Sequence, residues 1–373
     1  MKILQISNDF FGSKVHASLY KELSKQGIRQ TIYSPISSEN QIGKNAFSGE
    51  GTEILYDKVL KPYHSFVYHV KRRDIFRSLE QKVELKSIDL CHATTLFTDG
   101  GQAYKIFKKY GIPYIVAVRS TDVDDFLVYT PHTWLSGKKI LLNASKIVFI
   151  TPALKKKFCN HWFIKTFLSD IEDKIVIQPN GIDDYWIDNA VVETKKRDEG
   201  IVYVGTFLRR KHVVQLINAV VEARKVIPGL RLHLIGGGGS DETRVNSLVA
   251  KYSDCLSFYG KINDKDKLRS LYLNNSIFAM PSVRETFGLV YVEAMTQGMA
   301  LVFTKNDGVD GLFDAAVGES VNASSTKDIK TAIIDIINHR DAYMPAGTVD
   351  FEQFRWSSIA LKYNKMYQQI LSR

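Results

Sequence analysis

Short runs of β-forming residues alternate with helical stretches along this chain, and this alternation limits the fold more than any other feature. The first cycle begins at "KILQIS" (residues 2–7) and continues through "IDLCHAT", "YIVAVRS" and "KIVFIT"; a second begins at "GIVYVGTF" (200–207). Alternating β and α elements predict a parallel sheet with helices on both faces. The chain has 373 residues, and single cores stop growing at about 250–300 residues, so we expect two such units.

A polar stretch, "DNAVVETKKRDEG" (188–200), separates the two cycles. We therefore predict a first domain over residues 1–185 and a second over residues 186–354. The stretch "FRWSSIALKYNKMYQQILSR" (354–373) has apolar residues at helical spacing. This helix either caps the second domain or crosses back to the first. Ligands of doubly wound sheets bind at the carboxyl ends of the strands, and a cleft between two such domains is a usual small-molecule site.

Composition restricts the cellular setting. Hydrophobic residues make up 45% of the chain and charged residues 24%, as in soluble globular proteins. The three cysteines are far apart, which offers neither a disulfide framework nor metal-ligand spacing. The first residues resemble a strand rather than a signal peptide, and no run approaches the roughly 18–20 apolar residues of a membrane span. We expect a cytoplasmic protein. The net charge of +10 leaves nucleic acid, an anionic membrane and a phosphorylated small molecule as partners.

The segment "RETFGLVYVEAM" (284–295) carries two glutamates, Glu285 and Glu293, around an almost uncharged stretch. A helix is expected to begin near Phe287 and Gly288, and the first N–H groups of a helix form a ready anion site. Ionised carboxylates accept hydrogen bonds from sugar hydroxyls. The segment therefore fits a phosphate flanked by two sugar-binding carboxylates. The alternative is two surface charges on an ordinary helix.

Two further stretches also allow both a ligand-binding and a purely structural interpretation. In "VGTFLRRKHVVQLINA" (204–219), Gly205 ends a strand, and three basic residues precede a helix: Arg209, Arg210 and Lys211. Basic side chains at this place suit a diphosphate, and the alternative is a solvated run of charge. The run Gly236–Gly239 follows a strand and precedes a helix. It is either a nucleotide-contacting loop or a flexible connection.

The order "VGTFLRRK…LHLIGGGG…LSFYGKI…SIFAMPSVRETFGLVYVEAMTQG" resembles the C-terminal domain of family 4 retaining glycosyltransferases, which have the GT-B fold. The resemblance is strong over residues 200–315 and includes the E-x7-E element. It is weaker at "FFGSK", "YIVAVRSTDVDDF" and "IQPNGID", and the closing helix is similar to the family's returning helix. The resemblance implies an α/β protein with two Rossmann-like domains facing a central cleft, in which residues 355–373 rejoin the first domain.

The resemblance also implies roles for individual residues. Glu285 contacts the hydroxyls of the donor sugar, and Glu293 binds the ribose. The backbone of Phe287, Gly288 and Leu289 is expected to contact the sugar and the diphosphate. Lys211, Gly205 and Arg209 or Arg210 are expected at the diphosphate, and Gly12 is expected to lie against the phosphates. Lys261 and Ile262 are expected beside the base. Glu285, Lys211 and Arg210 are expected to act in catalysis, together with Arg119 and Asp122 of the first domain.

Two positions depart from the family pattern. Thr206 stands where an arginine often follows the glycine, so Arg209 or Arg210 is expected to supply that charge. The stretch from Arg119 to Asp122 stands where the family often has histidine in H-G-x-D. An arginine stays protonated and is no general base. Arg119 is therefore expected to bind the acceptor or a phosphate, and Asp122 is the first candidate base of an inverting reaction.

These observations predict a retaining transfer of a sugar from a nucleotide-diphosphate sugar, with UDP favoured as the nucleotide, to a glycan or lipid-linked acceptor. Polysaccharide or lipopolysaccharide synthesis is the expected setting. Positive charge and the helix start stabilise the leaving diphosphate, which itself accepts the proton, so no protein base is required. The resemblance implies neither a metal nor another cofactor. The alternatives are an inactive nucleotide-sugar-binding protein on the same scaffold and a GT-B-type sugar-nucleotide epimerase.

Other candidates have a structural and a functional interpretation. The D-x-D pairs within Asp122–Asp125 and Asp264–Asp266 suit a divalent ion, but metal-dependent D-x-D sites belong to the other major glycosyltransferase fold. His92 follows a strand and either faces the cleft or lies in the core.

Residues 56–77 mix basic with aromatic side chains, among them Tyr56, Phe66, Tyr68 and Arg72. This composition suits contact with an anionic membrane, which would place the protein at the inner face of the membrane. The alternative is a solvated helix with an apolar underside. Nucleic acid is not expected as a partner.

Overall fold

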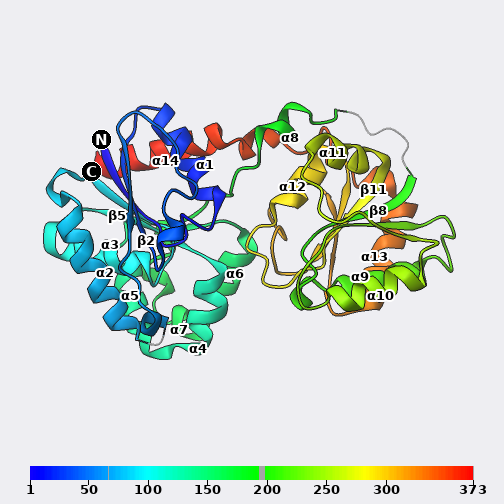
Figure 1. Ribbon diagram of the computed structural model, residues 1–373, viewed down its shortest axis with the longest axis horizontal. Helices are drawn as coiled ribbons and strands as arrows, with labels where there is room; N and C mark the ends of the chain where they lie inside the picture. Colours follow the sequence, from blue (N-terminus) through cyan, green and yellow to red (C-terminus); the bar gives the residue numbers. More distant parts are fainter. Residues whose placement is uncertain (66, 193–197, 373) are drawn as a thin grey trace. The chain divides into compact units, whose positions relative to one another are not determined.

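The computed structural model describes residues 1–65, 67–192 and 198–372, and these form two compact α/β units (Figure 1). Unit 1 comprises Met1–Ile150, Leu154–Gly181 and the chain from Gln353 onward. Unit 2 comprises Thr151–Ala153 and Ile182–Glu352. The chain thus passes between units at residues 181/182 and 352/353, against the predicted 185/186 and 354/355.

In its described residues, unit 1 contains a seven-stranded parallel sheet with the order β3-β2-β1-β4-β5-β6-β7. The strands are β1 (Lys2–Ile6), β2 (Arg29–Pro35), β3 (Thr52–Asp57), β4 (Leu90–Ala93), β5 (Tyr114–Val118), β6 (Lys146–Phe149) and β7 (Ile175–Ile177). The strand order reverses direction between β1 and β4, and ligands of doubly wound sheets bind at such a switch point. The sequence pattern does not reveal β3, because "TEILYD" is a partly exposed edge strand with polar ends.

The helices of unit 1 cover both faces of this sheet. They are α1 (Lys14–Lys25), α2 (Tyr68–Lys82), α3 (Asp99–Tyr110), α4 (Leu127–Tyr129), α5 (Trp134–Asn143), α7 (Trp162–Lys165), α14 (Trp356–Leu371) and most of α6 (Pro152–Asn160). Among the described residues, no helix is long and apolar enough to cross a membrane.

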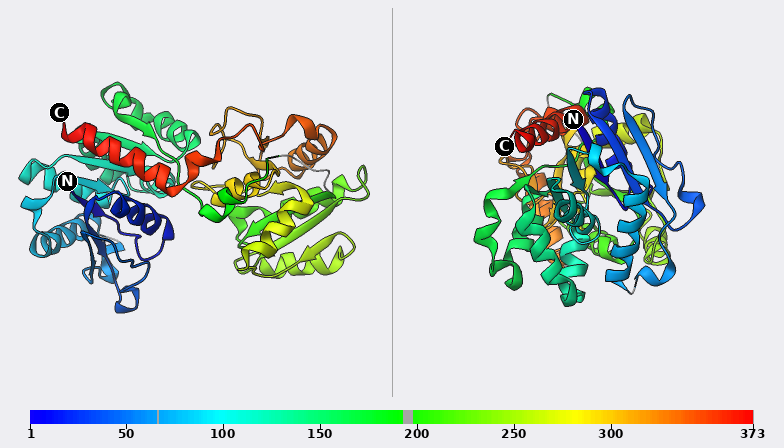
Figure 2. Two further views of the ribbon diagram at one scale, coloured as in Figure 1. Left: turned by 90° about the horizontal axis from the view of Figure 1, so that it is seen from above. Right: turned by 90° about the vertical axis from the view of Figure 1, so that its left-hand side faces the viewer.

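Helix α14 belongs to unit 1 although it follows unit 2 in the chain (Figure 2). It packs against α1 and buries one face, made of Ile359, Ala360, Tyr363, Met366 and Tyr367. These side chains join Ile3, Tyr20 and Leu23 in one hydrophobic cluster. The predicted return of the closing helix to the first domain is therefore what the chain does.

Unit 2 contains, in its described residues, a six-stranded parallel sheet with the order β10-β9-β8-β11-β12-β13. The strands are β8 (Asp198–Gly205), β9 (Arg231–Gly236), β10 (Leu256–Phe258), β11 (Asn275–Ala279), β12 (Ala300–Thr304) and β13 (Gly318–Val321). The helices are α8 (Asp184–Asp188), α9 (Val213–Ala223), α10 (Glu242–Lys251), α11 (Lys265–Asn274), α12 (Leu289–Thr296) and α13 (Thr326–Asn338). The switch point of this sheet lies between β8 and β11.

Candidate functional site

The loops after β8 and β11 meet at the switch point of unit 2. The backbone N–H of Val283 donates to the carbonyl oxygen of Arg210 at 2.9 Å, which fastens one loop to the other. The first loop carries the predicted basic residues, and the second carries Glu285. Strand order alone produces this meeting, because β8 and β11 are neighbours although β9 and β10 lie between them in the sequence.

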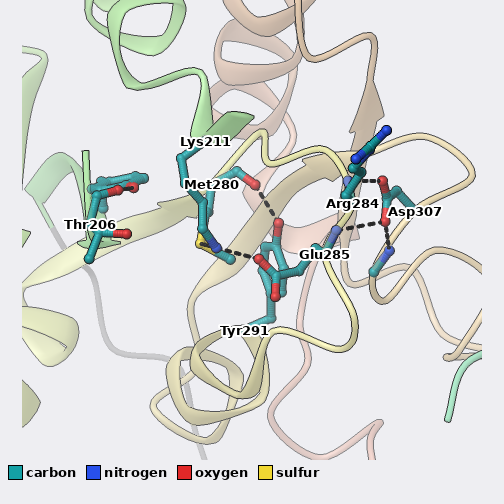
Figure 3. Close-up of polar contacts among 9 residues, drawn as sticks. Thr206, Lys211, Met280, Arg284, Glu285, Tyr291 and Asp307 are labelled. Atoms are coloured by element: carbon teal, nitrogen blue, oxygen red, sulfur yellow. Dashed lines mark hydrogen bonds and ion pairs between the residues drawn. The ribbon is translucent and has the colours of Figure 1, made fainter. Parts of the chain in front are cut away.

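Lys211 and Glu285 form an ion pair between these loops (Figure 3). Their side chains are only 11% and 15% exposed, and the Lys211 Nζ also lies 3.8 Å from the Met280 Sδ. A largely buried charge is costly unless it is paired, so each side chain holds the other in place. Two predicted site residues, 74 positions apart, are thereby brought into contact.

The backbone around Glu285 is fixed by Asp307, which follows β12. The Asp307 carboxylate accepts the N–H groups of Arg284 at 2.6 Å, Glu285 at 3.0 Å and Gly308 at 2.8 Å (Figure 3). Arg284 has a φ of +56°, a left-handed conformation that a non-glycine residue adopts only when its surroundings hold it there. Sequence reasoning missed Asp307; the available signal was an acidic residue in the polar turn after a predicted strand at the same sheet edge.

Gly288 is the residue before α12, and its backbone is left-handed with a φ of +77°. A Cβ atom at this position would lie 2.5 Å from the Tyr291 ring. The Tyr291 hydroxyl in turn donates to the Met280 carbonyl oxygen (Figure 3). The helix therefore begins where it was predicted, and its first N–H groups are at the same sheet edge as Lys211 and Glu285.

Glu293 lies within α12 and is largely buried. Burial, and to a smaller extent the neighbouring Asp183 carboxylate, raise the pKa of its carboxyl to about 7, whereas Lys265 opposes the shift. Asp183 accepts the Tyr185 N–H at 3.0 Å and pairs with Lys265 at 2.6 Å. Within the described residues, no side chain donates a hydrogen bond to the Glu293 carboxylate.

The glycine run after β9 is hydrogen-bonded to its neighbours. Gly236 has a φ of +123°, and a Cβ there would overlap the carbonyl of Gly205 at the end of β8. Phe207 donates its N–H to the Gly238 carbonyl at 2.7 Å, and Gly238 donates to Glu242 Oε1 at 2.8 Å. These hydrogen bonds connect the loop to the segment after β8 and to the start of α10.

The other predicted donor contacts surround this loop. The Arg209 N–H donates to Ser240 Oγ at 3.0 Å, and the side chains of Arg209 and Arg210 are exposed. Lys261 and Ile262 follow β10, beside Gly260, whose carbonyl accepts the Gly236 N–H at 2.8 Å. The structure thus gathers the predicted residues of unit 2 at one edge of its sheet.

Gly12, Arg119 and Asp122 lie in unit 1. Gly12 closes a turn after β1, with its N–H 3.1 Å from the Asp9 carbonyl. Arg119 follows β5, and its Nε donates to the Thr94 carbonyl at 3.1 Å.

Asp122 is buried, and its carboxylate accepts hydrogen bonds from backbone N–H groups. It accepts the N–H groups of Leu96 at 3.1 Å, Phe97 at 3.3 Å and Arg119 at 2.9 Å. Burial raises the pKa of Asp122 to about 6, against these hydrogen bonds. The geometry favours a residue that positions Arg119 and the loop after β4 over a general base.

His92 is a core residue. Its Nδ1 lies 2.8 Å from the Tyr367 hydroxyl, its ring stacks on Tyr363 at 5.1 Å, and burial lowers its pKa to about 3.

The D-x-D carboxylates have protein partners. Asp124 pairs with Lys157, Asp264 caps α11 through the N–H groups of Asp266 and Lys267, and Asp266 accepts the Tyr185 hydroxyl. In the part of the chain that the structure describes, no group of three or more His, Cys, Asp or Glu side chains could hold a metal ion.

The stretch 56–77 is not one exposed face. Arg72 is 7% exposed and donates to the Gly101 carbonyl at 2.8 Å and to Ser136 Oγ at 3.2 Å. The Tyr68 hydroxyl donates to the Phe97 carbonyl at 2.9 Å, and burial raises the Tyr68 pKa to about 12. These two residues face the interior of unit 1, contrary to their place in the predicted membrane contact. Phe66 lies outside the described residues.

Two doubly wound parallel sheets, with a lysine, a helix start and sugar-compatible carboxylates at one switch point, are the features expected of a GT-B glycosyltransferase. Comparison with known proteins agrees: residues 184–347 match the family model described as glycosyl transferases group 1. The match covers most of unit 2 and supports a glycosyltransferase of the family 4 type.

Three similar proteins illustrate the relationship. An uncharacterized glycosyltransferase of Methanocaldococcus jannaschii is 22% identical over 317 residues, which cover 83% of each chain. Phosphatidyl-myo-inositol mannosyltransferase of Mycobacterium tuberculosis is 25% identical over 203 residues, 52% of this chain and 53% of the relative. The structure of Anabaena HepE in complex with UDP and glucose superposes with a TM-score of 0.68 at 14% identity, covering 99% and 100% of the two chains. The similarity to Anabaena HepE shows the fold alone.

Proposed function

We propose that this protein transfers a sugar from a nucleotide-diphosphate sugar, with UDP as the favoured nucleotide, to a hydroxyl of a glycan or lipid-linked acceptor. The transfer retains the anomeric configuration and requires no metal. Cell-surface polysaccharide or lipopolysaccharide synthesis is the setting we favour. The Lys211–Glu285 pair at the switch point of unit 2 is the observation that carries the proposal.

The pair suits a donor in two ways. The Lys211 ammonium is held at the sheet edge without being exposed, so it is in place to meet the negative charge that grows on a departing diphosphate. The Glu285 carboxylate accepts hydrogen bonds and therefore suits the hydroxyls of a sugar. The exposed Arg209 and Arg210 on the same loop add positive charge for the phosphates.

The acceptor half of the proposal rests on unit 1. Arg119 cannot accept a proton, and the Asp122 carboxylate already accepts three backbone N–H groups. A reaction in which the departing phosphate takes the acceptor's proton needs no protein base. These contacts support retention over an inverting reaction with Asp122 as base.

The test is to incubate the purified protein with a panel of nucleotide sugars and to measure release of nucleoside diphosphate. We expect slow release from one donor by hydrolysis and faster release when the acceptor is present. Glu285→Ala should lower the rate by about 10²–10³, as expected for loss of one preorganised contact. Glu222→Ala, at an exposed glutamate of unit 2 that pairs with Lys225, is the matched control and should change nothing.

Other outcomes favour other functions. A donor that raises the melting temperature but is never cleaved indicates an inactive binding protein. Formation of a free epimer without any acceptor indicates an epimerase. Full activity of Glu285→Ala contradicts the assignment of the site.

A further inference from the structure

Asp9 lies in the loop after β1, at the switch point of unit 1. Strands β1, β4 and β5 are neighbours in this parallel sheet, so the loops that follow them meet at one edge. The loop after β4 leads to Asp99 at the start of α3, and the loop after β5 carries Arg119 and Asp122. Ligands of doubly wound sheets bind at such an edge. Three carboxylates therefore lie where a ligand of unit 1 is expected.

Two of these three carboxylates already have protein partners. Asp122 accepts three backbone N–H groups. Asp99 is 1% exposed, and its carboxylate accepts the Thr94 hydroxyl at 2.8 Å and the Thr95 hydroxyl at 3.0 Å. The Asn8 side-chain amide also donates to Asp99, at 3.1 Å. Asp99 and Asp122 therefore hold the loops of this edge together.

The Asp9 carboxylate has no such partners. Among the described residues, no hydrogen bond or ion pair reaches it. Asp9 is exposed, yet the surrounding atoms exclude enough water to raise the pKa of its carboxyl, which the nearby Arg119 guanidinium partly offsets. An ionised carboxylate only accepts hydrogen bonds. Asp9 is therefore placed to accept them from a ligand.

The backbone of Asp9 is fixed on both sides. Asn8, the residue before it, is held by Asp99 through its side-chain amide and, at 3.4 Å, through its backbone N–H. Phe10, the residue after it, is fully buried, and its carbonyl oxygen accepts the side-chain amide of Asn45 at 2.8 Å. Two side chains far apart in the sequence thus position a carboxylate that itself has no protein partner.

Gly12 leaves room for the Asp9 side chain. A Cβ atom at Gly12 would lie 2.4 Å from Asp9 Oδ1, a distance at which one of them must move. The N–H groups of Gly12 and Ser13 donate to the Asp9 carbonyl at 3.1 and 3.0 Å, so the turn itself brings the glycine to the carboxylate. Gly12 does not have a positive φ. The space that Asp9 occupies, and not the backbone conformation, therefore accounts for a glycine here.

We propose that Asp9 binds hydroxyl groups of the acceptor sugar, an inference that rests on the proposed transferase function. The two carboxylate oxygens accept hydrogen bonds from neighbouring hydroxyls of one sugar ring. Ionised phosphate and carboxylate groups have no hydrogen to donate to Asp9. The part of the acceptor that meets Asp9 is therefore an uncharged sugar residue, whose binding Asp9 strengthens.

A donor phosphate fits this place less well. Gly12 was expected to lie against the donor phosphates, but the Asp9 carboxylate lies directly beside it. Two negative charges at short range repel each other. The contact favours a glycine that makes room for Asp9 over one that admits a phosphate.

The test uses the purified full chain, the donor that it hydrolyses, and the methyl glycosides of glucose, galactose, mannose and N-acetylglucosamine as soluble acceptors. Release of nucleoside diphosphate is measured against glycoside concentration. We expect at least one glycoside to accelerate release by the parent, and Asp9→Asn to raise the KM for that glycoside by about tenfold or more. The donor KM should not rise. Asp173→Asn, at an exposed aspartate before β7 on the opposite edge of the same sheet, is the matched control.

A second pair of variants tests the contact between Gly12 and Asp9. Gly12→Ala should displace the carboxylate and raise the glycoside KM by about tenfold. In a protein that already carries Asp9→Ala, the same change should raise it by less than about twofold, because interacting residues are not additive. Equal factors in the two backgrounds would overturn the proposal, and so would a higher donor KM caused by Gly12→Ala when Asp9 is alanine.

The proposal is also wrong if Asp9→Asn leaves the glycoside KM unchanged, or if no glycoside accelerates a parent that hydrolyses its donor. Thermal melts of Asp9→Asn and the parent should coincide, because the carboxylate has no partner among the described residues. Donor hydrolysis without any glycoside tests the transferase site alone. A parent that lacks this hydrolysis contradicts the proposed function, whereas a parent that shows it can still fail the test of Asp9.

Discussion

Asp307 determines where Glu285 stands. One carboxylate accepts three backbone N–H groups and maintains the left-handed backbone of Arg284, the residue before Glu285. Glu285 in turn pairs with Lys211. A residue with no expected contact to the substrate therefore positions a carboxylate and an ammonium together.

Replacing Asp307 should impair activity although Asp307 itself is not expected to contact the substrate. Asp307→Ala leaves three N–H groups without their acceptor, and hydrogen bonds to a charged group contribute about 1.5–3 kcal/mol each. We expect kcat/KM for donor cleavage to fall by roughly ten- to a hundredfold. Asp307→Asn retains one acceptor oxygen and should recover part of the loss. Parent-like kinetics in Asp307→Ala would show that Glu285 is positioned by other contacts.

Glu293 should make stability depend on pH. Its pKa is about 7 in the folded protein against a model value of 4.5, so the folded state favours the neutral carboxyl. A raised carboxyl pKa lowers stability as pH rises from about 4.5 to about 7, and the loss is complete above that range. Glu293→Gln removes this dependence.

Thermal melts of the parent and Glu293→Gln measure the effect. The two proteins should melt closer together at about pH 5 than at about pH 8, where the variant gains on the order of 3 kcal/mol at most. A difference that does not change with pH would mean that Glu293 is ionised throughout.

At the scale of the element, α12 depends on the backbone of the residue before it. Gly288 combines a left-handed conformation with close contact to Tyr291, which fastens α12 to the end of β11 through Met280. The start of this helix and the position of Glu285 are therefore parts of one local arrangement.

Gly288→Ala should lower both stability and donor affinity. A left-handed alanine costs about 1–2 kcal/mol, and the added Cβ must also displace the Tyr291 ring. Gly111→Ala is the matched control, because Gly111 has a φ of +73° and no atom within 4 Å of an added Cβ. Thermal melts should show a larger loss for Gly288→Ala, and only that variant should weaken nucleotide binding. Equal losses in both would exclude a role for the Tyr291 contact.

The helices and strands also show how much of the structure could be predicted from the sequence alone. The central strands were predictable because they are continuous apolar runs, and α12 because a glycine precedes its apolar stretch. The short strand β13, "GESV", is only partly buried and has no such pattern. The contact of Lys211 with Glu285 depends on which strands are neighbours, and the role of Asp307 depends on its backbone partners. The first leaves no local signal in the sequence, and the second leaves only an acidic residue in the polar turn after a predicted strand.

At the scale of the whole molecule, α14 completes the core of unit 1. Ile359 is 1% exposed within the cluster that also contains Tyr20 and Leu23. Unit 1 therefore depends on a helix that lies after all of unit 2 in the chain.

Ile359→Ala should destabilise unit 1 by about 2–5 kcal/mol, because it leaves a cavity in a packed core. Leu361→Ala on the same helix is the control, since Leu361 is 47% exposed and should change stability by less than about 0.5 kcal/mol. Chemical denaturation monitored by circular dichroism measures both. If the two variants unfold alike, α14 does not contribute to the core as its burial indicates.

The position of α14 also has a consequence for synthesis on the ribosome. Chains with several domains generally fold them in the order in which they are made. Here the segment that completes unit 1 begins at Gln353, after the last residue of unit 2, Glu352. Unit 2 is therefore the first unit that can finish folding during translation. The face of α1 that packs against α14 stays uncovered until α14 has left the exit tunnel.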